Sequence, residues 1–263
     1  MPTISLRPPR RLLAVLLPIV LLATLLPGAE ESPGQPARIR VLLVTGGHDF
    51  ERKQFFEMFQ TNTDLSLQTI EHTNLAGFLK PSQAQTYDVL ALYDMWQNIS
   101  DEMKADFVEL LRQGKGLVVL HHALCSYQDW PEYRRIVGGR YLLNKTVLDG
   151  VEWPASSYQH GRHFVVHVVD QSHPITQGVR DFEIHDETYK GFNVTADAHP
   201  LLTTDDPEST GTIAWTKSYL NARVFFMQSG HDHYAWDNPN YQRLLQQGIR
   251  WVAGSKGGPG RSK

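Results

Sequence analysis

The residues of this sequence with the clearest chemical potential are histidines that directly follow short apolar, strand-like runs. Three runs are followed in this way: 41–44 by His48, 117–120 by His121 and His122, and 224–227 by His231 and His233. In an open parallel sheet, the loops beyond the carboxyl ends of the strands converge on one crevice, where ligands bind. We therefore expect these imidazoles to meet at one active site that holds a metal.

The spacing of the histidines limits how many of them reach the crevice. Neighbouring strand residues point to opposite faces, so only one of His121 and His122 is expected to face it. His231 and His233 are two residues apart in a loop that starts with Gly230. This spacing suits a metal, although the same loop can simply cap the strand.

The best pair of carboxylates is Asp186-Glu187. A zinc site with an open position uses three ligands of the His and Asp/Glu type, and it lowers the pKa of bound water to about 7. One carboxylate can then be a ligand and the other a general base, or both can bind the hydroxyl groups of a sugar. The alternative is a solvated acidic turn. Asp94 ends a further predicted strand, and Trp96 lies in the loop after it, where aromatic rings often stack on sugars.

Other catalytic motifs are missing from the sequence. It contains no G-x-S-x-G elbow, no Walker loop and no G-x-G-x-x-G after a strand. Cys125 is the single cysteine. A Cys125 nucleophile would need a lowered pKa and a paired base such as His121 or His122. We favour a small, buried residue at this position over a nucleophile.

Strand and helix signals alternate from residue 38 onward. Strands are predicted at 38–45, 65–70, 89–93 and 116–120, and a helix at 53–61. Another helix begins after Ser100, a good N-cap, and ends before Gly114. This order predicts an α/β fold with a mostly parallel sheet that is covered by helices on both faces.

The second half of the domain is less regular. We expect a short helix at 130–137, a strand at 164–169, a pair of strands at 212–217 and 223–229, and a closing helix at 240–253. Residues 170–211 are rich in turn-forming residues and receive no assignment.

The ends of the chain differ in composition from the domain. Residues 1–29 combine arginines, an apolar stretch and small residues, which predicts a secretory signal peptide and a periplasmic or secreted protein without stable membrane insertion after cleavage. Residues 30–37 are expected to form a linker, 38–254 the folded domain and 255–263 a disordered tail. The formal charge of -3 and the absence of a basic stripe argue against nucleic-acid binding.

Several segments together resemble the ThuA family, the trehalose-utilisation proteins with a class I glutamine-amidotransferase-like fold. The matching segments are 44–48, 114–121, 173–178, 186–189, 223–231 and 249–251. The resemblance covers about residues 38–254 and implies a flavodoxin-like domain. His121 stands where the amidotransferases have their nucleophilic cysteine, which argues against glutamine hydrolysis. The segment that follows, from His122 to Cys125, departs from the small residues that are common in relatives.

The resemblance also implies an activity and roles for individual residues. It implies an enzyme of carbohydrate catabolism, with metal-assisted hydrolysis or lyase-type cleavage of a sugar or 3-keto-glycoside. The divalent metal, for which zinc is a candidate, would be bound by His121, Glu187 and His231. Asp186 is expected to be a general acid/base or to support the ligands. The remaining expected roles are proton transfer or substrate contact for His48 and His233, and substrate binding for Asp94, Trp96 and Tyr189. The alternative is a non-catalytic sugar-binding module; the oligomeric state is left open.

Overall fold

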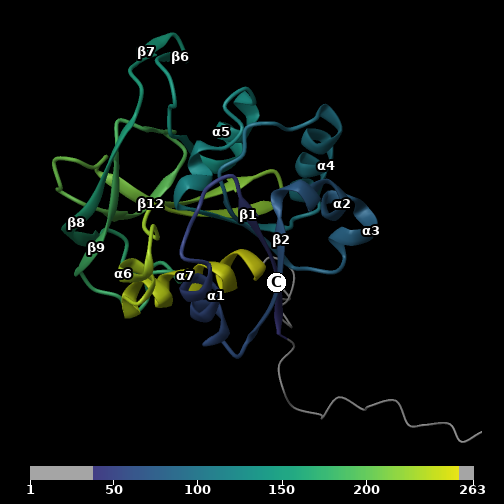
Figure 1. Ribbon diagram of the computed structural model, residues 1–263, viewed down its shortest axis with the longest axis horizontal. Helices are drawn as coiled ribbons and strands as arrows, with labels where there is room; N and C mark the ends of the chain where they lie inside the picture. Colours follow the sequence, from purple (N-terminus) through teal and green to yellow (C-terminus); the bar gives the residue numbers. More distant parts are fainter. Residues whose placement is uncertain (1–37, 255–263) are drawn as a thin grey trace, which may run out of the picture. The chain divides into compact units, whose positions relative to one another are not determined.

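The computed structural model describes residues 38–254, which form an α/β fold around a mixed sheet (Figure 1). In these residues the large sheet has nine strands in the order β2-β1-β3-β4-β13-β12-β11-β8-β9. Its parallel half comprises β2 (Leu65–Glu71), β1 (Ile39–Gly46), β3 (Val89–Asp94), β4 (Gly116–Leu120) and β13 (Ala222–Met227). The predicted fold class is confirmed.

An antiparallel half extends this sheet beyond β13. It comprises β12 (Thr212–Tyr219), β11 (His199–Thr203), β8 (Ser157–Val168) and β9 (Phe182–Lys190). Two small sheets complete the strands: β5 (Gly139–Arg140) pairs with β10 (Asn193–Val194), and β6 (Thr146–Leu148) pairs with β7 (Val151–Trp153).

Helices cover both faces of the parallel half because alternate residues of its fully buried strands point to opposite sides. Val41 and Leu43 belong to one hydrophobic cluster, and Leu42 and Val44 to the other. The first cluster packs against α1 (Arg52–Gln60), α6 (His233–Trp236) and α7 (Pro239–Ala253). The second packs against α2 (Leu75–Leu79), α3 (Pro81–Ala84), α4 (Asp101–Arg112) and α5 (Pro131–Val137). Figure 1 shows α1 and α7 on one side of the sheet and α4 and α5 on the other.

The N-cap predicted for α4 is present, since the hydroxyl of Ser100 accepts a hydrogen bond from the backbone N–H of Met103. The antiparallel half differs from the sequence prediction. The strand expected at 164–169 begins already at Ser157, and the unassigned segment 170–211 contains β9 and β11. The start of β8 is exposed and polar, so it has no apolar pattern, and pairing with β9 forms the strand.

The predicted signal peptide, linker and tail lie outside the described residues. Between residues 38 and 254, no helix is both long enough and apolar enough to cross a membrane.

Candidate functional site

Histidines from three strand-end loops lie together beyond the carboxyl ends of β1, β4 and β13. The ring of His48 stacks on that of His122 with centroids 4.6 Å apart, and it meets the ring of His231 edge-on at 6.4 Å. The ring of His121 lies 5.4 Å from that of His231. Parallel strands therefore carry residues that are distant in sequence to one place.

His121 is buried and its orientation is fixed by hydrogen bonds. It begins a 3₁₀ turn, η2 (His121–Cys125), with a φ of 49°, which side-chain-bearing residues seldom adopt. Its Nδ1 lies 2.7 Å from the carbonyl oxygen of Gln228. Since that oxygen only accepts, Nδ1 carries a proton, and Nε2 is the ring nitrogen directed at Glu187. Nε2 lies 2.9 Å from the hydroxyl of Tyr189.

His121 and His122 take different positions at the site, and only His122 lines the cavity. The strand ends at Leu120, and in the turn that follows neighbouring side chains no longer alternate. His121 contacts Glu187, whereas His122 lines the adjoining cavity. Burial and the neighbouring His121 and His48 hold the pKa of His122 well below its ordinary value, so this ring is neutral at pH 7.

Glu187 joins two of these histidines into a possible ligand set. Its Oε2 lies 3.1 Å from Nε2 of His121 and 3.5 Å from Nδ1 of His231. One ligand atom from each of the three residues lies within 4.8 Å of the others. Burial raises the pKa of Glu187, but the three surrounding histidines outweigh it and lower the pKa overall. The carboxylate is therefore ionised at neutral pH, as a metal ligand must be.

The two histidines of this set differ in how readily they lose a proton. Burial lowers the pKa of His121, but hydrogen bonding to Glu187 and the charge of Asp186 raise it overall. Burial and the neighbouring His121 lower the pKa of His231. Two imidazoles and one carboxylate around an open position form a donor set that suits zinc.

His160 also belongs to this site, although it was not among the residues predicted from the sequence. Its Nδ1 lies 3.0 Å from Oε1 of Glu187, and its ring is 4.6 Å from that of His231. A β-bulge places it there, because His160 and Gly161 on β8 stand opposite the single residue Glu187 on β9. Such bulges redirect side chains, and the φ of +63° at Gly161 suits glycine.

Asp186 and Glu187 have different surroundings because neighbouring residues on β9 point to opposite faces. The carboxylate of Asp186 is buried and accepts hydrogen bonds from the backbone N–H of Gly230 at 2.8 Å and of His231 at 3.0 Å. Burial raises its pKa to about 6, although His121 and these bonds oppose the shift. Asp186 thus holds the loop that carries His231.

The raised pKa of Asp186 predicts a pH effect on stability. Between about pH 4 and pH 6, Asp186 binds more protons in the folded chain than in the unfolded chain. The free energy of unfolding that is due to Asp186 therefore decreases as pH rises through this range. The full effect is on the order of 3 kcal/mol. We expect an Asp186→Asn variant to lack this decrease, measured by urea unfolding at several pH values. Unfolding free energies with the same pH slope in both proteins would contradict the assignment.

Three residues with predicted roles lie apart from the cluster around Glu187. Asp94 is fully buried and bonds through Oδ2 to Nδ1 of His72 at 2.6 Å, while the ring of Trp96 stacks on that of His72. Nδ1 of His233 pairs with the carboxylate of Glu51 at 2.9 Å. The structure therefore does not bring these three residues into contact with the three ligand candidates.

A cavity of about 230 Å³ opens beside the cluster. Its lining combines titratable groups with three tyrosine rings. The lining residues that matter here are His48, His122, His160, Glu187, Tyr141, Tyr158 and Tyr189. Aromatic rings next to polar groups are the usual lining of a small-molecule site.

Cys125 lines the same cavity but is only 3% exposed. Burial and the charge of Glu187 raise the pKa of its thiol, which is opposite to the activation that a nucleophile needs. We expect a thiol reagent such as Ellman's reagent to label the folded chain at least about 100-fold more slowly than the chain in urea. Rapid stoichiometric labelling of the folded chain would instead support a thiol mechanism.

Solved structures with this fold come from several bacteria. A ThuA-like protein from Parabacteroides merdae matches with a TM-score of 0.70 and 21% identity, over 86% of this chain and 94% of its own. A ThuA-like protein from Bacteroides uniformis matches with a TM-score of 0.65 and 18% identity, over 86% and 95%. A β-galactosidase from Bacillus circulans shares the fold over 83% of this chain but only 31% of its own, with a TM-score of 0.54 and 9% identity.

These structural matches are all of low identity and show the fold alone. The family assignment comes from sequence comparison. A search of curated proteins found no significant match. The model of the ThuA family, described as trehalose utilisation, matches residues 40–252, which is nearly the whole described domain. The chain therefore belongs to the ThuA family.

Proposed function

We propose that this protein is an exported, metal-dependent enzyme of carbohydrate catabolism. The proposed reaction is hydrolysis or lyase-type cleavage of a sugar or 3-keto-glycoside, with a divalent metal such as zinc held by His121, Glu187 and His231. The observation that supports it most is the fixed orientation of His121. Its Nδ1–H donates to the carbonyl of Gln228, which directs Nε2 at Glu187 and His231, where it can bind a metal after losing any proton of its own.

The chemistry of the donor set is consistent with such a role. A divalent metal at this position would polarise a substrate oxygen and lower the pKa of bound water. The chain's own groups have separate tasks: Asp186 fixes the loop of His231, and Tyr189 directs its hydroxyl toward His121. His48 and His122 lie side by side at the cavity, and we assign proton transfer or substrate contact to His48.

The cavity next to the cluster supports a sugar as the substrate. The exposed ring of Tyr158 offers a face on which a pyranose can stack, and His160 offers a nitrogen for its hydroxyl groups. A non-catalytic sugar-binding module would use the same contacts without turnover, and it is the second candidate.

The test compares the full chain with two variants of the same strand. Glu187→Gln removes the ligand charge at constant size, and Glu183→Gln makes the same change at an exposed position of β9. Each protein is stripped with a chelator, reloaded with zinc, analysed for metal by mass spectrometry and incubated with ordinary and 3-keto disaccharides.

We expect about one zinc per chain and product formation in the original protein and in Glu183→Gln, and neither in Glu187→Gln. Sugar binding without product would favour the binding module. Zinc content at background level in the original protein would contradict the metal proposal. The proposed export predicts that the chain recovered from the native host lacks residues 1–29, which N-terminal sequencing tests.

A further inference from the structure

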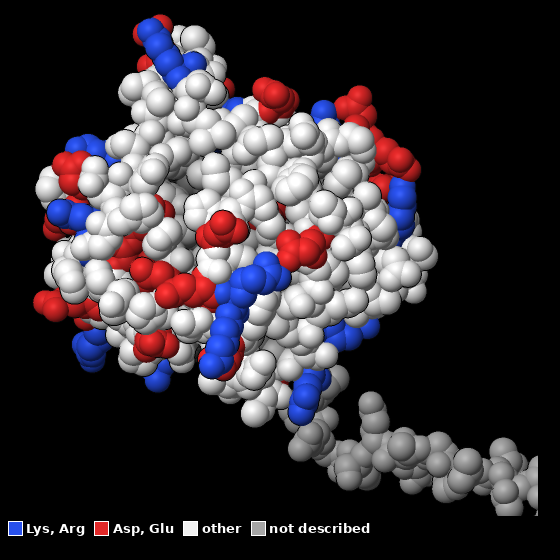
Figure 2. All heavy atoms as spheres, in the orientation of Figure 1, with Lys and Arg blue, Asp and Glu red and all other residues white. Residues whose placement is uncertain are grey.

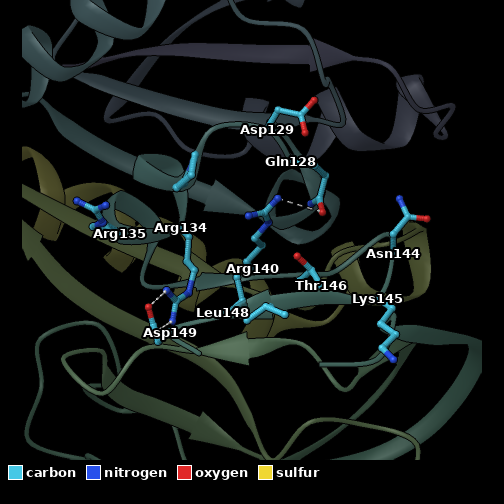
Figure 3. Close-up of a pocket in the computed structure, with 12 residues that line it drawn as sticks. Gln128, Asp129, Arg134, Arg135, Arg140, Asn144, Lys145, Thr146, Leu148 and Asp149 are labelled. Atoms are coloured by element: carbon cyan, nitrogen blue, oxygen red, sulfur yellow. Dashed lines mark hydrogen bonds and ion pairs between the residues drawn. The ribbon is translucent and has the colours of Figure 1, made fainter. Parts of the chain in front are cut away.

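A second cavity, of about 530 Å³, lies between α5 and the segment 140–149 (Figure 3). Its volume falls within the range of about 300–1,000 Å³ that is typical of small-molecule sites. None of its lining residues belongs to the cavity that holds Glu187 and His160.

Cationic side chains dominate the charged part of this lining. Four basic residues face two acidic ones: Arg134, Arg135, Arg140 and Lys145 against Asp129 and Asp149. This excess is local, because the chain as a whole has a formal charge of -3. Figure 2 shows basic side chains scattered among acidic ones on the face in view, without a broad basic surface.

Three of the four cations already have carboxylate partners. Arg134 pairs with Asp149 at 2.6 Å, Arg135 with Glu132 at 2.9 Å, and Lys145 with Glu152 at 2.6 Å. These pairs shape the wall and neutralise much of its charge.

Arg140 differs from the other three cations. No carboxylate among the described residues 38–254 forms an ion pair with it. Its Nε is buried without a hydrogen-bond partner, and one terminal nitrogen donates to Oε1 of Gln128 at 3.4 Å, near the limit for such a bond. In Figure 3 this contact is the single dashed line drawn to Arg140.

Strand pairing holds the backbone of Arg140, and hydrogen bonds hold the neighbouring side chain of Gln128. Arg140 pairs with Asn193 between β5 and β10. The amide nitrogen of Gln128 donates to the carbonyls of Cys125 and Tyr141. A half-buried guanidinium without an anionic partner is costly, because burial weakens its hydration. A ligand that supplies the anion would remove this cost, and the planar guanidinium suits a phosphate or carboxylate group.

We propose that this cavity is a second binding site, which takes a small organic anion and holds its phosphate or carboxylate group on the guanidinium of Arg140. The amide of Asn144 and the hydroxyl of Thr146 on the same lining offer contacts for the polar body of the ligand. The site shares a wall with the histidine cavity, since Tyr141 and Leu143 line that cavity while Arg140 and Asn144 line this one.

Calorimetric titration of the full chain tests the proposal with four probes: inorganic phosphate, a hexose 6-phosphate, glucuronate and neutral glucose. We expect at least one of the three anions to bind at millimolar concentration or below. Arg140→Gln should weaken that binding by about tenfold or more, the worth of a charged hydrogen bond. Arg140→Lys keeps the charge but not the two-pronged geometry, so an intermediate loss is expected.

Arg112→Gln is the matched control, because it makes the same charge change on α4, away from the cavity. Its anion affinity should equal that of the original chain. Preference for the phosphates or for glucuronate identifies the recognised group. The proposal is overturned if no anion binds, if Arg140→Gln binds as tightly as the original chain at an unchanged melting temperature, or if Arg112→Gln loses as much affinity. If Arg140→Gln fails to fold, the anion affinity of Arg140→Lys is compared with that of the original chain instead, and an unchanged affinity would overturn the proposal.

Discussion

Replacing His121 by alanine is expected to lower zinc affinity by roughly 100-fold or more, since even groups that only support a ligand are worth 10–100-fold. The change removes one of the three proposed ligand atoms, and it removes the one whose orientation is fixed by the carbonyl of Gln228. The remaining Glu187 and His231 would hold a metal with two ligands, which is fewer than stable protein zinc sites use.

The measurement is a competition titration of the full chain against a chromophoric zinc chelator. His163→Ala is the matched control, because it also removes an imidazole but lies on the exposed side of β8, stacked on His185. We expect the control to bind zinc as the original chain does. Equal zinc affinity in His121→Ala and the original chain would rule out His121 as a ligand.

Gly47→Ala is expected to destabilise the fold by about 2–4 kcal/mol and to displace His48. A Cβ at Gly47 would lie 2.0 Å from the carbonyl oxygen of Met95, and its φ of +76° is unfavourable for alanine. The backbone strain alone costs of order 1 kcal/mol. The clash adds more, because the oxygen belongs to the backbone and a large part of the loop after β3 must move.

Two other glycines separate the contributions to this effect. Gly150 has a φ of +81° with open space around it, so Gly150→Ala should cost only the strain, about 1 kcal/mol. Gly77 lies in α2, and a Cβ added there would have no neighbouring atom within 4 Å outside its own helix backbone. Gly77→Ala should therefore be neutral or slightly stabilising. The free energy of unfolding from urea titrations ranks the three variants. If Gly47→Ala lowers the free energy of unfolding no more than Gly150→Ala does, the contact with Met95 has no effect on stability.

The parallel half of the fold was predictable from the sequence because its signals are local. Most of its strands are short apolar runs, β2 has alternating apolar residues, and Ser100 and Gly114 mark the ends of α4. The antiparallel half was predictable only in part. The strands expected at 212–217 and 164–169 are present as β12 and the end of β8, but β9, β11 and the exposed polar start of β8 were missed. The strand character of this start depends on pairing with β9, and such pairing leaves no trace in a short window of sequence.

The candidate site divides in the same way. The position of His48, His121 and His231 just beyond strand ends follows from the sequence, as does the presence of an acidic pair at 186–187. The tertiary structure decided which carboxylate joins which partner: Glu187 contacts the histidines, and Asp186 binds the loop at Gly230. Alternation along β9 separates them, but the face of each depends on the strand's register.

The fold class, the family and the strand-end placement of the chemical groups follow from the amino-acid sequence alone, since these depend on local apolar patterns and local motifs. Three contacts required the folded domain: His160 reaches Glu187 through a bulge, His121 contacts Glu187 while His122 lines the cavity, and Asp94 pairs with His72. These contacts depend on the register of distant strands and on one turn with a positive φ. Both result from the packing of the whole domain, because no short stretch of the chain specifies them alone.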